Sequence, residues 1–398
     1  MTTIRTEHQT TSIETMLRRA AIPATSQLVL DLQTRRAVAI KVITSDLAEP
    51  LDAVTIVRTL NLMAAHQGRP VGPVIIEVPR STLLTVAPAG QHSEHPMILS
   101  LLAEGLLDHP AESLRLVQRA RELGWEIGLR GVGRSTATLA AVSVFEPSLV
   151  TLAVEILADP ASALAVETLQ TVTAFRHATG ATVMAEPLDS GTLRHTAQSL
   201  GATIGSGDAV PRDTTELPAE LDYTLDLFVS PRQPEHQMSP YEISIQRHQS
   251  QRAHRSLVAS AGRRIEQTAR TSGRSSIVLA CFQHARHLTP SISETYSELA
   301  GHTEMIMLAA GGLRRAPAAG VSWTDLARHD TLRREWTVLL LAPTTAMLLA
   351  AREVRRASKH DEREFDYTLS YERDLVAHAA RSLLTRLPTR DQPRRLAP

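Results

Sequence analysis

The stretch Glu122-Leu-Gly-Trp-Glu-Ile-Gly-Leu-Arg-Gly-Val-Gly-Arg-Ser-Thr-Ala-Thr-Leu139 decides how the first half of the chain folds. A helix is predicted to lead into it, because apolar residues recur at helical spacing at Leu114, Val117, Ala120 and Leu123. Gly124 ends that helix, and a short strand, Trp125 to Leu129, follows before a glycine-bearing loop. A helix, a strand and a loop in this order are typical of the repeating unit of a β/α barrel.

Length and composition narrow the classes of protein. A chain of 398 residues predicts two domains, and 43% hydrophobic residues indicate ordinary globular folding. The 42 basic residues balance 42 acidic ones, so there is no strong signal for nucleic acid or for an anionic membrane surface. The single cysteine, Cys281, excludes a disulfide within the chain. With no signal peptide and no apolar run long enough for a bilayer, we expect a cytoplasmic protein.

Strands and helices alternate on both sides of the central stretch. Two strands, Gln27 to Leu32 and Ala37 to Ile43, are predicted to form a hairpin. The further predicted elements are the helix Leu51 to Gln67, the strands Val74 to Val78, Met97 to Leu102 and Leu149 to Leu152, and the helices Ala161 to Thr179 and Thr192 to Leu200. The fragment Ala181-Thr-Val-Met-Ala-Glu-Pro-Leu-Asp189 lies between the last two.

The order and spacing of these parts resemble the EAL family of cyclic-di-GMP phosphodiesterases over roughly residues 24 to 212. The resemblance implies an α/β fold with a TIM-like (β/α) barrel, somewhat trimmed because the segment before Val74 is short. The fragment 181–189 is the best preserved part, since it matches the family's A-E-G-V-E motif. The family's metal-binding D-D-F-G, in contrast, reads Arg130-Gly-Val-Gly133.

The resemblance also implies which residues replace the metal ligands. Lys41 stands at the name-giving Glu, and an ammonium has no lone pair to offer a metal ion. Glu77 aligns with the family's Asn ligand, and Glu186 and Asp189 keep its two acids. The family's dinucleotide-holding Arg and Gln become Ser45 and Ser206. Hydrolysis in the family needs two divalent ions, so we expect no catalytic residue, no metal site and no cofactor here.

The candidate vestigial or ligand-binding site therefore consists of Lys41, Glu77, Arg130, Glu186 and Asp189. We expect Lys41 and Arg130 to lie close to Glu186 at the C-terminal mouth of the barrel. One interpretation is an ion pair of Glu186 with either cation that fills the vacated site. The other is that the Arg130 guanidinium binds a phosphate group bidentately.

The second half resembles the DICT family, a small α/β sensory module. The resemblance lies in the run Val278-Leu-Ala-Cys-Phe-Gln-His-Ala-Arg-His-Leu-Thr289, in Tyr296 and in Glu335-Trp336. The predicted elements are the strands Ser276 to Cys281, Glu304 to Ala309, Trp336 to Leu341 and Tyr367 to Tyr371, and the helices Ser291 to Ala300, Thr344 to Arg352 and Glu372 to Leu387. Candidate residues of a sensory pocket are Phe282, His284, Tyr296 and Trp336, which equally suit an ordinary core.

These observations divide the chain into an N-terminal segment (1–23), the barrel (24–212), a linker and connecting helix (213–270) and the sensory domain (271–390). A helix is predicted from Pro240 to Arg270, with one face formed by His254, Leu257, Val258, Ala261, Ile265 and Ala269. That face predicts a homodimer through this helix, or else packing of the helix on its own domain.

Two functions follow for a barrel without metal ligands, and a third is kept as an alternative. The first is a non-catalytic signalling protein that acts through a protein partner. The second is a receptor that still binds cyclic-di-GMP or another nucleotide without hydrolysing it. The third is an unusual active phosphodiesterase.

Overall fold

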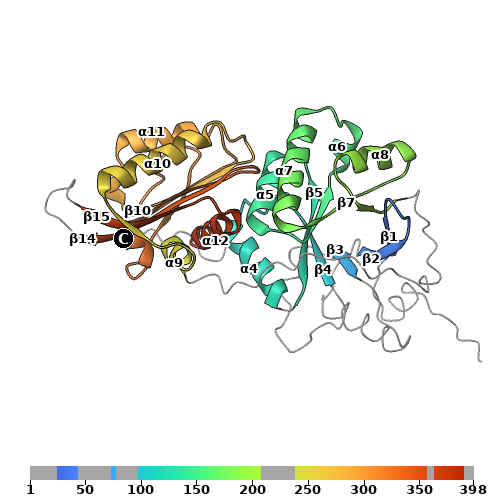
Figure 1. The fold of residues 1–398 in the computed structure, drawn as a ribbon, viewed down its shortest axis with the longest axis horizontal. Helices are drawn as coiled ribbons and strands as arrows, with labels where there is room; N and C mark the ends of the chain where they lie inside the picture. Colours follow the sequence, from blue (N-terminus) through green and yellow to red (C-terminus); the bar gives the residue numbers. More distant parts are fainter. Residues whose placement is uncertain are drawn as a thin grey trace, which may run out of the picture.

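The computed structural model describes residues 25–43, 73–77, 97–122, 124–207, 238–355 and 363–389. Within these ranges the chain forms a barrel and a separate sheet domain, which lie against each other (Figure 1). The N-terminal segment 1–23, Ser45, the helix Leu51 to Gln67 and the linker from 213 to 237 lie outside the described residues. No helix in the described part of the chain is both long and apolar enough to cross a membrane.

The barrel closes through eight strands in sequence order. They are β1 (Thr25–Asp31), β2 (Ala37–Ile43), β3 (Val74–Glu77), β4 (Met97–Leu102), β5 (Glu126–Val132), β6 (Leu149–Leu152), β7 (Thr182–Ala185) and β8 (Ile204–Gly205). The first strand is antiparallel to both of its neighbours, β2 and β8. From β2 to β8 every neighbouring pair is parallel. The predicted hairpin and the predicted barrel are therefore confirmed.

Five described helices belong to the barrel: α4 (Pro110–Glu122), α5 (Thr136–Phe145), α6 (Val154–Ala158), α7 (Ala163–Thr179) and α8 (Gly191–Ser199). The helix α7 ends where the sequence predicts, because Gly180 adopts the left-handed conformation with a φ of 76°. Side chains alternate between the two faces of each strand, and the inward ones form a small apolar cluster that includes Ile75, Ile98 and Met184.

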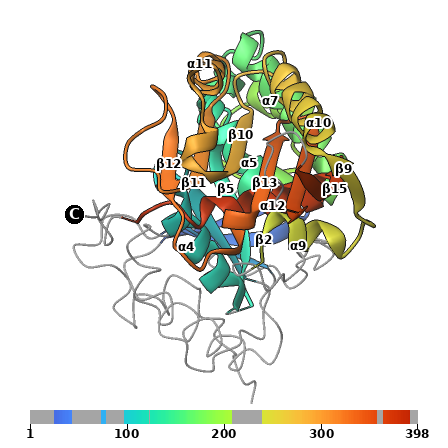
Figure 2. The same ribbon diagram turned by 90° about the vertical axis from the view of Figure 1, so that its left-hand side faces the viewer.

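The sheet domain has seven strands in the order β12-β11-β10-β13-β14-β15-β9. Their bounds are β9 Gln251–His254, β10 Ile277–His284, β11 Met305–Gly311, β12 Ser322–Asp325, β13 Glu335–Leu341, β14 Ala346–Arg355 and β15 Glu364–Ser370. The helices α10 (Arg255–Ala269) and α11 (Pro290–Leu299) cover one face of the sheet (Figure 2). The other face carries α9 (Pro240–Ile245) and α12 (Arg373–Leu384). Two 3₁₀ turns, Ala285–His287 and Thr331–Arg334, connect strands and helices.

Two predicted helices are wrong. The segment Thr344 to Arg352 forms most of strand β14, because a strand covered on both faces needs no alternation and Ala- and Leu-rich residues suit it as well as a helix. The helix predicted from Pro240 to Arg270 is interrupted: α9 ends at Ile245, and Gln251–His254 pairs with β15 as the edge strand β9. The short strand β12 was not predicted.

Half of the apolar stripe proposed for a dimer packs within its own domain. Val258, Ile265 and Ala269 of α10 are fully buried in the core that also contains the sheet residues Val338 and Leu349. The alternative of packing on the same chain holds for these three residues, whereas His254 and Leu257 are exposed. Residues 240–270 belong to the sheet domain by their strand pairing and packing, and not to a connector ending at residue 270. Whether two chains associate elsewhere stays a prediction.

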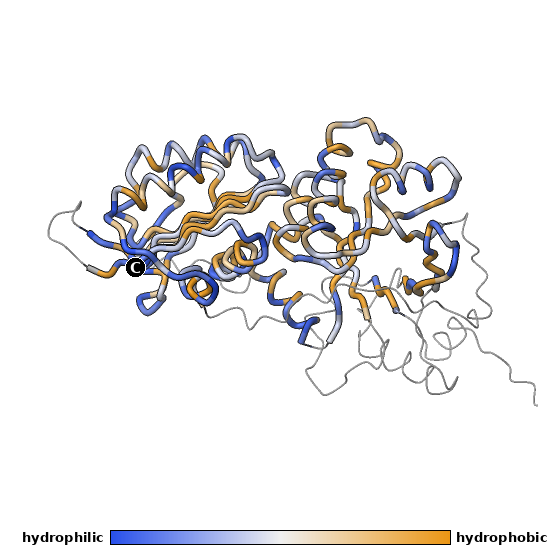
Figure 3. Tube along the Cα trace, in the orientation of Figure 1, coloured by the Kyte–Doolittle hydropathy of each residue, from blue (hydrophilic) through white to orange (hydrophobic). Residues whose placement is uncertain are grey.

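Helix α12 lies between the two domains. Ten of its twelve residues, from Leu375 to Leu384, are buried. One continuous core contains α12 side chains, sheet residues such as Leu339 and Leu348, and barrel-helix residues such as Leu114 and Val142. A helix that is buried all round is expected where both sides are covered by apolar surfaces. Figure 3 shows hydrophobic residues concentrated along the strands of the sheet.

Candidate functional site

The mouth of the barrel holds a buried cation between two carboxylates. Lys41, on β2, is 5% exposed, and its Nζ lies 2.6 Å from Oε2 of Glu186 and 2.8 Å from Oε1 of Glu77. Glu77 is the last residue of β3, and Glu186 directly follows β7. The carboxyl ends of parallel strands meet at this edge, which is where barrels place their sites. The predicted proximity of Lys41 and Glu186 is therefore present.

The second predicted cation faces Glu77. Nε of Arg130, on β5, lies 4.0 Å from Oε1 of Glu77, and the Arg130 side chain is 38% exposed. Among the described residues, this Nε has no hydrogen-bond partner. Arg130 thus makes a longer and more solvated ion pair than Lys41 does, and the rest of its guanidinium borders an open pocket.

That pocket has a volume of about 360 Å³ and contains most of the predicted site residues in its wall. Lys41, Arg130, Glu186 and Asp189 line it, together with Gln27, Arg134, Thr151 and Ser206. The hydroxyl of Ser206 donates to Oε2 of Glu186 over 2.9 Å, so this carboxylate is held from two sides. The structure therefore brings the five predicted residues of the barrel to one place.

The donor set at this place does not fit a divalent metal pair. Lys41 Nζ lies 2.6 to 2.8 Å from one oxygen each of Glu77 and Glu186, so an ammonium, which has no lone pair to offer a metal, stands where these carboxylates converge and repels a second cation there. In the described part of the chain there is no group of three or more His, Cys, Asp or Glu residues arranged to hold a metal ion. Lys41 contacts both carboxylates, and Arg130 adds a second, longer ion pair to Glu77.

Sequence reasoning missed Arg134, which lines the same pocket. Gly131 near the end of β5 and Gly133 directly after it set the path of the chain here, with φ angles of 74° and 95°. A side chain at Gly133 would lie 2.8 Å from atoms of Ile156 and Thr168, so the chain passes close to α6 and α7 here. Arg134 forms an ion pair with Glu155 (2.9 Å) beside the pocket. Its position four residues after Arg130 in a glycine-bearing loop was the available signal.

In the sheet domain, three of the four predicted pocket residues pack together. Phe282 lies 6.0 Å from Tyr296 and 6.5 Å from Trp336 between ring centroids, and Trp336 lies 6.0 Å from Phe365. Tyr296 is fully buried and its hydroxyl donates to Oε1 of Glu266 over 2.8 Å. Burial raises the pKa of both groups, of the Glu266 carboxyl and of the Tyr296 phenol. This arrangement supports the interpretation of these aromatic residues as core.

The fourth predicted pocket residue is placed differently. His284 ends β10, and its ring lies 5.7 Å from that of His287 in an edge-to-face arrangement. It is therefore paired with the following turn and not with the three packed aromatic side chains.

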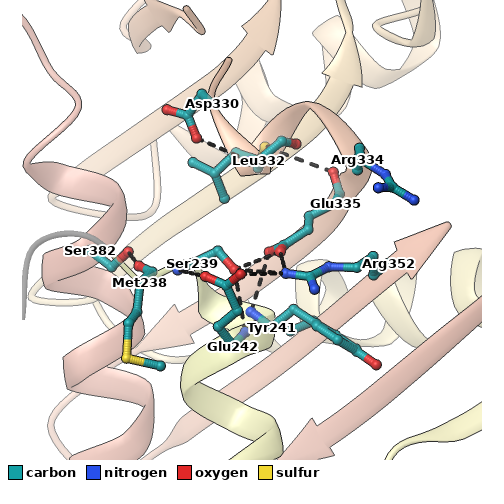
Figure 4. A network of polar contacts seen from close by, with 12 residues as sticks. Met238, Ser239, Tyr241, Glu242, Asp330, Leu332, Arg334, Glu335, Arg352 and Ser382 are labelled. Atoms are coloured by element: carbon teal, nitrogen blue, oxygen red, sulfur yellow. Dashed lines mark hydrogen bonds and ion pairs between the residues drawn. The ribbon is translucent and has the colours of Figure 1, made fainter.

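A buried polar network that the sequence did not predict ties α9 to the sheet (Figure 4). Glu335 is fully buried and accepts hydrogen bonds from the Ser239 hydroxyl (2.5 Å), the Tyr241 backbone N–H (3.3 Å) and Arg352 (2.7 Å). Burial raises the pKa of the Glu335 carboxyl, while these donors lower it. Arg352 also pairs with Glu242 at 3.0 Å. The network has the features of a structural joint, because each charged group in it has a partner.

Comparisons with known proteins bear on both halves of the chain. Residues 240–354 match the DICT family, described as a sensory domain in diguanylate cyclases and two-component systems. The chain has no match among curated proteins.

EAL domains are among the solved structures that are similar to this chain. The Xanthomonas citri FimX EAL domain in complex with c-diGMP has 14% identity, covers 50% of this chain and 92% of its own, and has a TM-score of 0.38. The EAL domain of Mycobacterium smegmatis DcpA has 13% identity, covers 47% and 91%, and has a TM-score of 0.38. Vibrio cholerae LapD (S helix-GGDEF-EAL, bound to c-di-GMP) has 14% identity, covers 50% and 56%, and has a TM-score of 0.38.

The family match begins at Pro240, so it includes α9, β9 and α10 together with the central strands of the sheet. The sequence placed the start of the sensory domain at residue 271, whereas the family match starts two helices and one strand earlier. The DICT module expected from the sequence is confirmed over residues 240–354, within the sheet domain.

Proposed function

We propose that this chain is a non-catalytic signalling protein, in which a barrel without a divalent metal centre is joined to a DICT sensory module. The observation that carries the proposal is the position of Lys41 Nζ, within 2.8 Å of both Glu77 and Glu186. Metal-assisted phosphodiester hydrolysis needs ions that activate water and neutralise the phosphate. The Lys41 ammonium has no vacant coordination site with which to activate water, and its positive charge is already engaged by two carboxylates.

The test is a hydrolysis assay with cyclic-di-GMP in the presence of Mg²⁺ or Mn²⁺. We expect no linear product above a control without protein. Product that disappears in Glu186→Ala would overturn the proposal and would make the chain an unusual phosphodiesterase. The variant with Arg130→Asp and Gly131→Asp should stay inactive, because Lys41 still neutralises Glu77 and Glu186.

A receptor function is the second candidate, and the exposure of Arg130 favours it. This guanidinium borders the pocket beside Arg134, and its one described ion pair, to Glu77, is 4.0 Å long. Guanidinium groups bind phosphate oxygens bidentately, so an anionic nucleotide such as cyclic-di-GMP is the ligand class to try first. Isothermal titration tests this, with Arg130→Ala as the variant that should weaken binding and Arg119→Ala, on a distant helix face, as its matched control.

The remaining parts of the proposal concern assembly. A signalling role without catalysis requires a protein partner, and we propose a cytoplasmic homodimer as the working state. Sedimentation at micromolar concentration tests the dimer: a single species at the chain mass of 43.4 kDa would exclude it.

A further inference from the structure

The sheet domain contacts the first turn of α5, the helix that follows the loop 133–135 at the mouth of the barrel. The hydroxyl of Thr136, the first residue of α5, donates to Oε2 of Glu304 over 2.6 Å. Glu304 directly precedes β11, and its backbone N–H donates to the carbonyl of Ser276, which directly precedes β10. A carboxylate at a helix N-terminus is favoured by the helix dipole. The sheet domain therefore contributes an anion at the start of a barrel helix, beside the barrel's own Glu104, which accepts from the hydroxyl of the N-cap residue Ser135.

The same helix is held by the sheet domain at its other end. Arg381 of α12 forms an ion pair with Glu146, the residue after α5, at 2.7 Å, and both side chains are largely buried. Arg373 of α12 donates to the hydroxyl of Ser143 over 2.6 Å and to the carbonyl of Ala342 over 2.7 Å. Through these two arginines, α12 connects the end of α5 to the sheet.

Helix α5 is also joined to the loop that carries the mouth residues. The Thr138 hydroxyl accepts from the backbone N–H of Gly133 (3.0 Å) and donates to the carbonyl of Ser135 (2.7 Å). Every residue from Thr138 to Phe145 is buried, so the helix is packed over most of its length. Because closely packed elements transmit strain to one another, a shift of α5 moves Gly133 and with it Arg134, which lines the pocket.

From this geometry we propose that α5 couples the sheet domain to the barrel mouth, with the Thr136–Glu304 contact as the point of control. A change in the sensory domain that withdraws Glu304 removes one of two carboxylates from the start of α5, leaving Glu104 on the Ser135 hydroxyl, and loosens the segment 131–135. Coupling between two sites is reciprocal. A ligand or a substitution at the mouth therefore alters the local stability of the backbone at Ser276 and Glu304, directly before β10 and β11. The proposal rests on the proposed function only in treating the mouth as the signalling site; the coupling itself needs no ligand.

Amide hydrogen exchange of the full chain tests the coupling. In Glu304→Ala we expect the amides of 131–136 to exchange roughly fivefold faster, as for the loss of one net hydrogen bond of about 1 kcal/mol. Glu304→Gln keeps an acceptor for Thr136 and should stay closer to the wild-type protein. The matched control is Glu298→Ala, which removes an exposed pair with Arg270 in the same domain and should leave 131–136 unchanged. Unchanged exchange at 131–136 in Glu304→Ala would overturn the proposal.

The reverse direction uses a change at the mouth. Gly133→Ala places a side chain where φ is 95° and where Ile156 and Thr168 lie 2.8 Å away, so the loop must shift. We expect the amides of Glu304 and Met305 to exchange faster in this variant. If Gly133→Ala does not fold by circular dichroism, Thr138→Val removes the loop-to-helix hydrogen bonds with little change in volume. If a folded variant shows faster amide exchange at the barrel mouth but unchanged exchange at Glu304 and Met305, the coupling is rejected.

The outcome is distinguishable from a failure of the proposed function. Hydrolysis of cyclic-di-GMP by the wild-type chain would overturn the non-catalytic role and leave the exchange result standing. Equal exchange in Glu304→Ala and wild type would reject the coupling and leave the non-catalytic role standing.

Discussion

Nζ of Lys41 lies 2.6 Å from Oε2 of Glu186, across the mouth of the barrel from β2 to the end of β7. These strands are not neighbours in the closed barrel, so the ion pair joins two separate parts of its rim. Since Glu77 contacts the same Nζ, the two carboxylates share one cation. Removing that cation leaves two partly buried negative charges close together, and the consequences can be measured.

Lys41→Met should destabilise the chain by about 2 to 3 kcal/mol. This is below the 3 to 5 kcal/mol typical of breaking a fully buried pair, because the two carboxylates keep some contact with water. Denaturant unfolding measures the change. Arg119→Ala, which removes the exposed pair with Glu122, is the control and should change stability by less than about 0.5 kcal/mol. Equal effects of the two variants would mean that Lys41 is as solvated as a surface residue.

Lys41→Ala should also create a weak site for a divalent cation. Without the ammonium, Glu77 and Glu186 present carboxylate oxygens to the same point, and Asp189 lines the same pocket. We expect millimolar Mn²⁺ to raise the melting temperature of Lys41→Ala more than that of the wild-type chain, since a ligand that binds the folded state stabilises it. The double variant Lys41→Ala with Glu186→Ala should lose the effect. A wild-type response as large as that of Lys41→Ala would contradict the prediction.

Glu266 should make the sheet domain less stable as the pH rises. Burial raises the pKa of this carboxyl above its ordinary value of 4.5, so the folded state binds its proton more tightly than the unfolded state does. The contribution is fully present below that ordinary value and is lost as the pH rises through the raised pKa. Glu266→Gln should therefore flatten the dependence of unfolding free energy on pH in this window.

The control for Glu266 is Glu298, a carboxyl whose pKa is lowered and not raised. The hydrogen bond from Arg270 lowers the pKa of Glu298, which is exposed. Glu298→Gln should not flatten the fall in stability toward higher pH. The Glu266 prediction fails if Glu266→Gln and the wild-type chain show parallel curves.

The pair of Arg381 and Glu146 should hold the two domains in one unfolding transition. Both side chains are largely buried at the contact of α12 with the end of α5. Arg381→Met should cost about 3 kcal/mol, since it leaves the Glu146 carboxylate without its charged partner, and should separate the calorimetric transition of the barrel from that of the sheet domain. Glu146→Gln with Arg381→Met should recover part of the loss. Arg252→Ala, at an exposed pair with Asp366, is the control and should keep a single transition.

Two neighbouring residues of α10, Leu257 and Val258, allow an effect on folding stability to be distinguished from an effect on dimer formation. Val258 is fully buried against the sheet, whereas Leu257 is 54% exposed. Val258→Asp should destabilise the domain by about 3 kcal/mol or more, because it buries a charge without a partner. Leu257→Asp should leave stability nearly unchanged, and sedimentation then shows whether this exposed residue contributes to a dimer. A dimer that survives Leu257→Asp would have its interface elsewhere.

Much of the fold was predictable where local pattern and tertiary environment agree. The hairpin, the strand after Gly124 and the helix that ends at Gly180 were predicted within a few residues, since turn glycines and apolar spacing mark their ends. The pattern failed at Thr344 to Arg352, where burial on both faces of the sheet outweighs a composition that suits a helix. It failed again at Gln251–His254, a polar segment that becomes a strand only by pairing with β15.

For the candidate site, too, some features were predictable from the sequence and others only from the tertiary structure. From the sequence, the resemblance to the EAL family implied that Lys41, Glu77, Arg130, Glu186 and Asp189 belong to one end of a barrel, because these positions align with motifs that follow parallel strands and the carboxyl ends of such strands meet at one edge. Only the tertiary structure decided that Lys41 contacts two carboxylates while Arg130 stays half solvated, since those distances depend on side chains from strands far apart in the chain. The same holds for Glu304 at the start of α5: a contact across 168 positions of sequence leaves no local pattern, and packing of the two domains alone creates it.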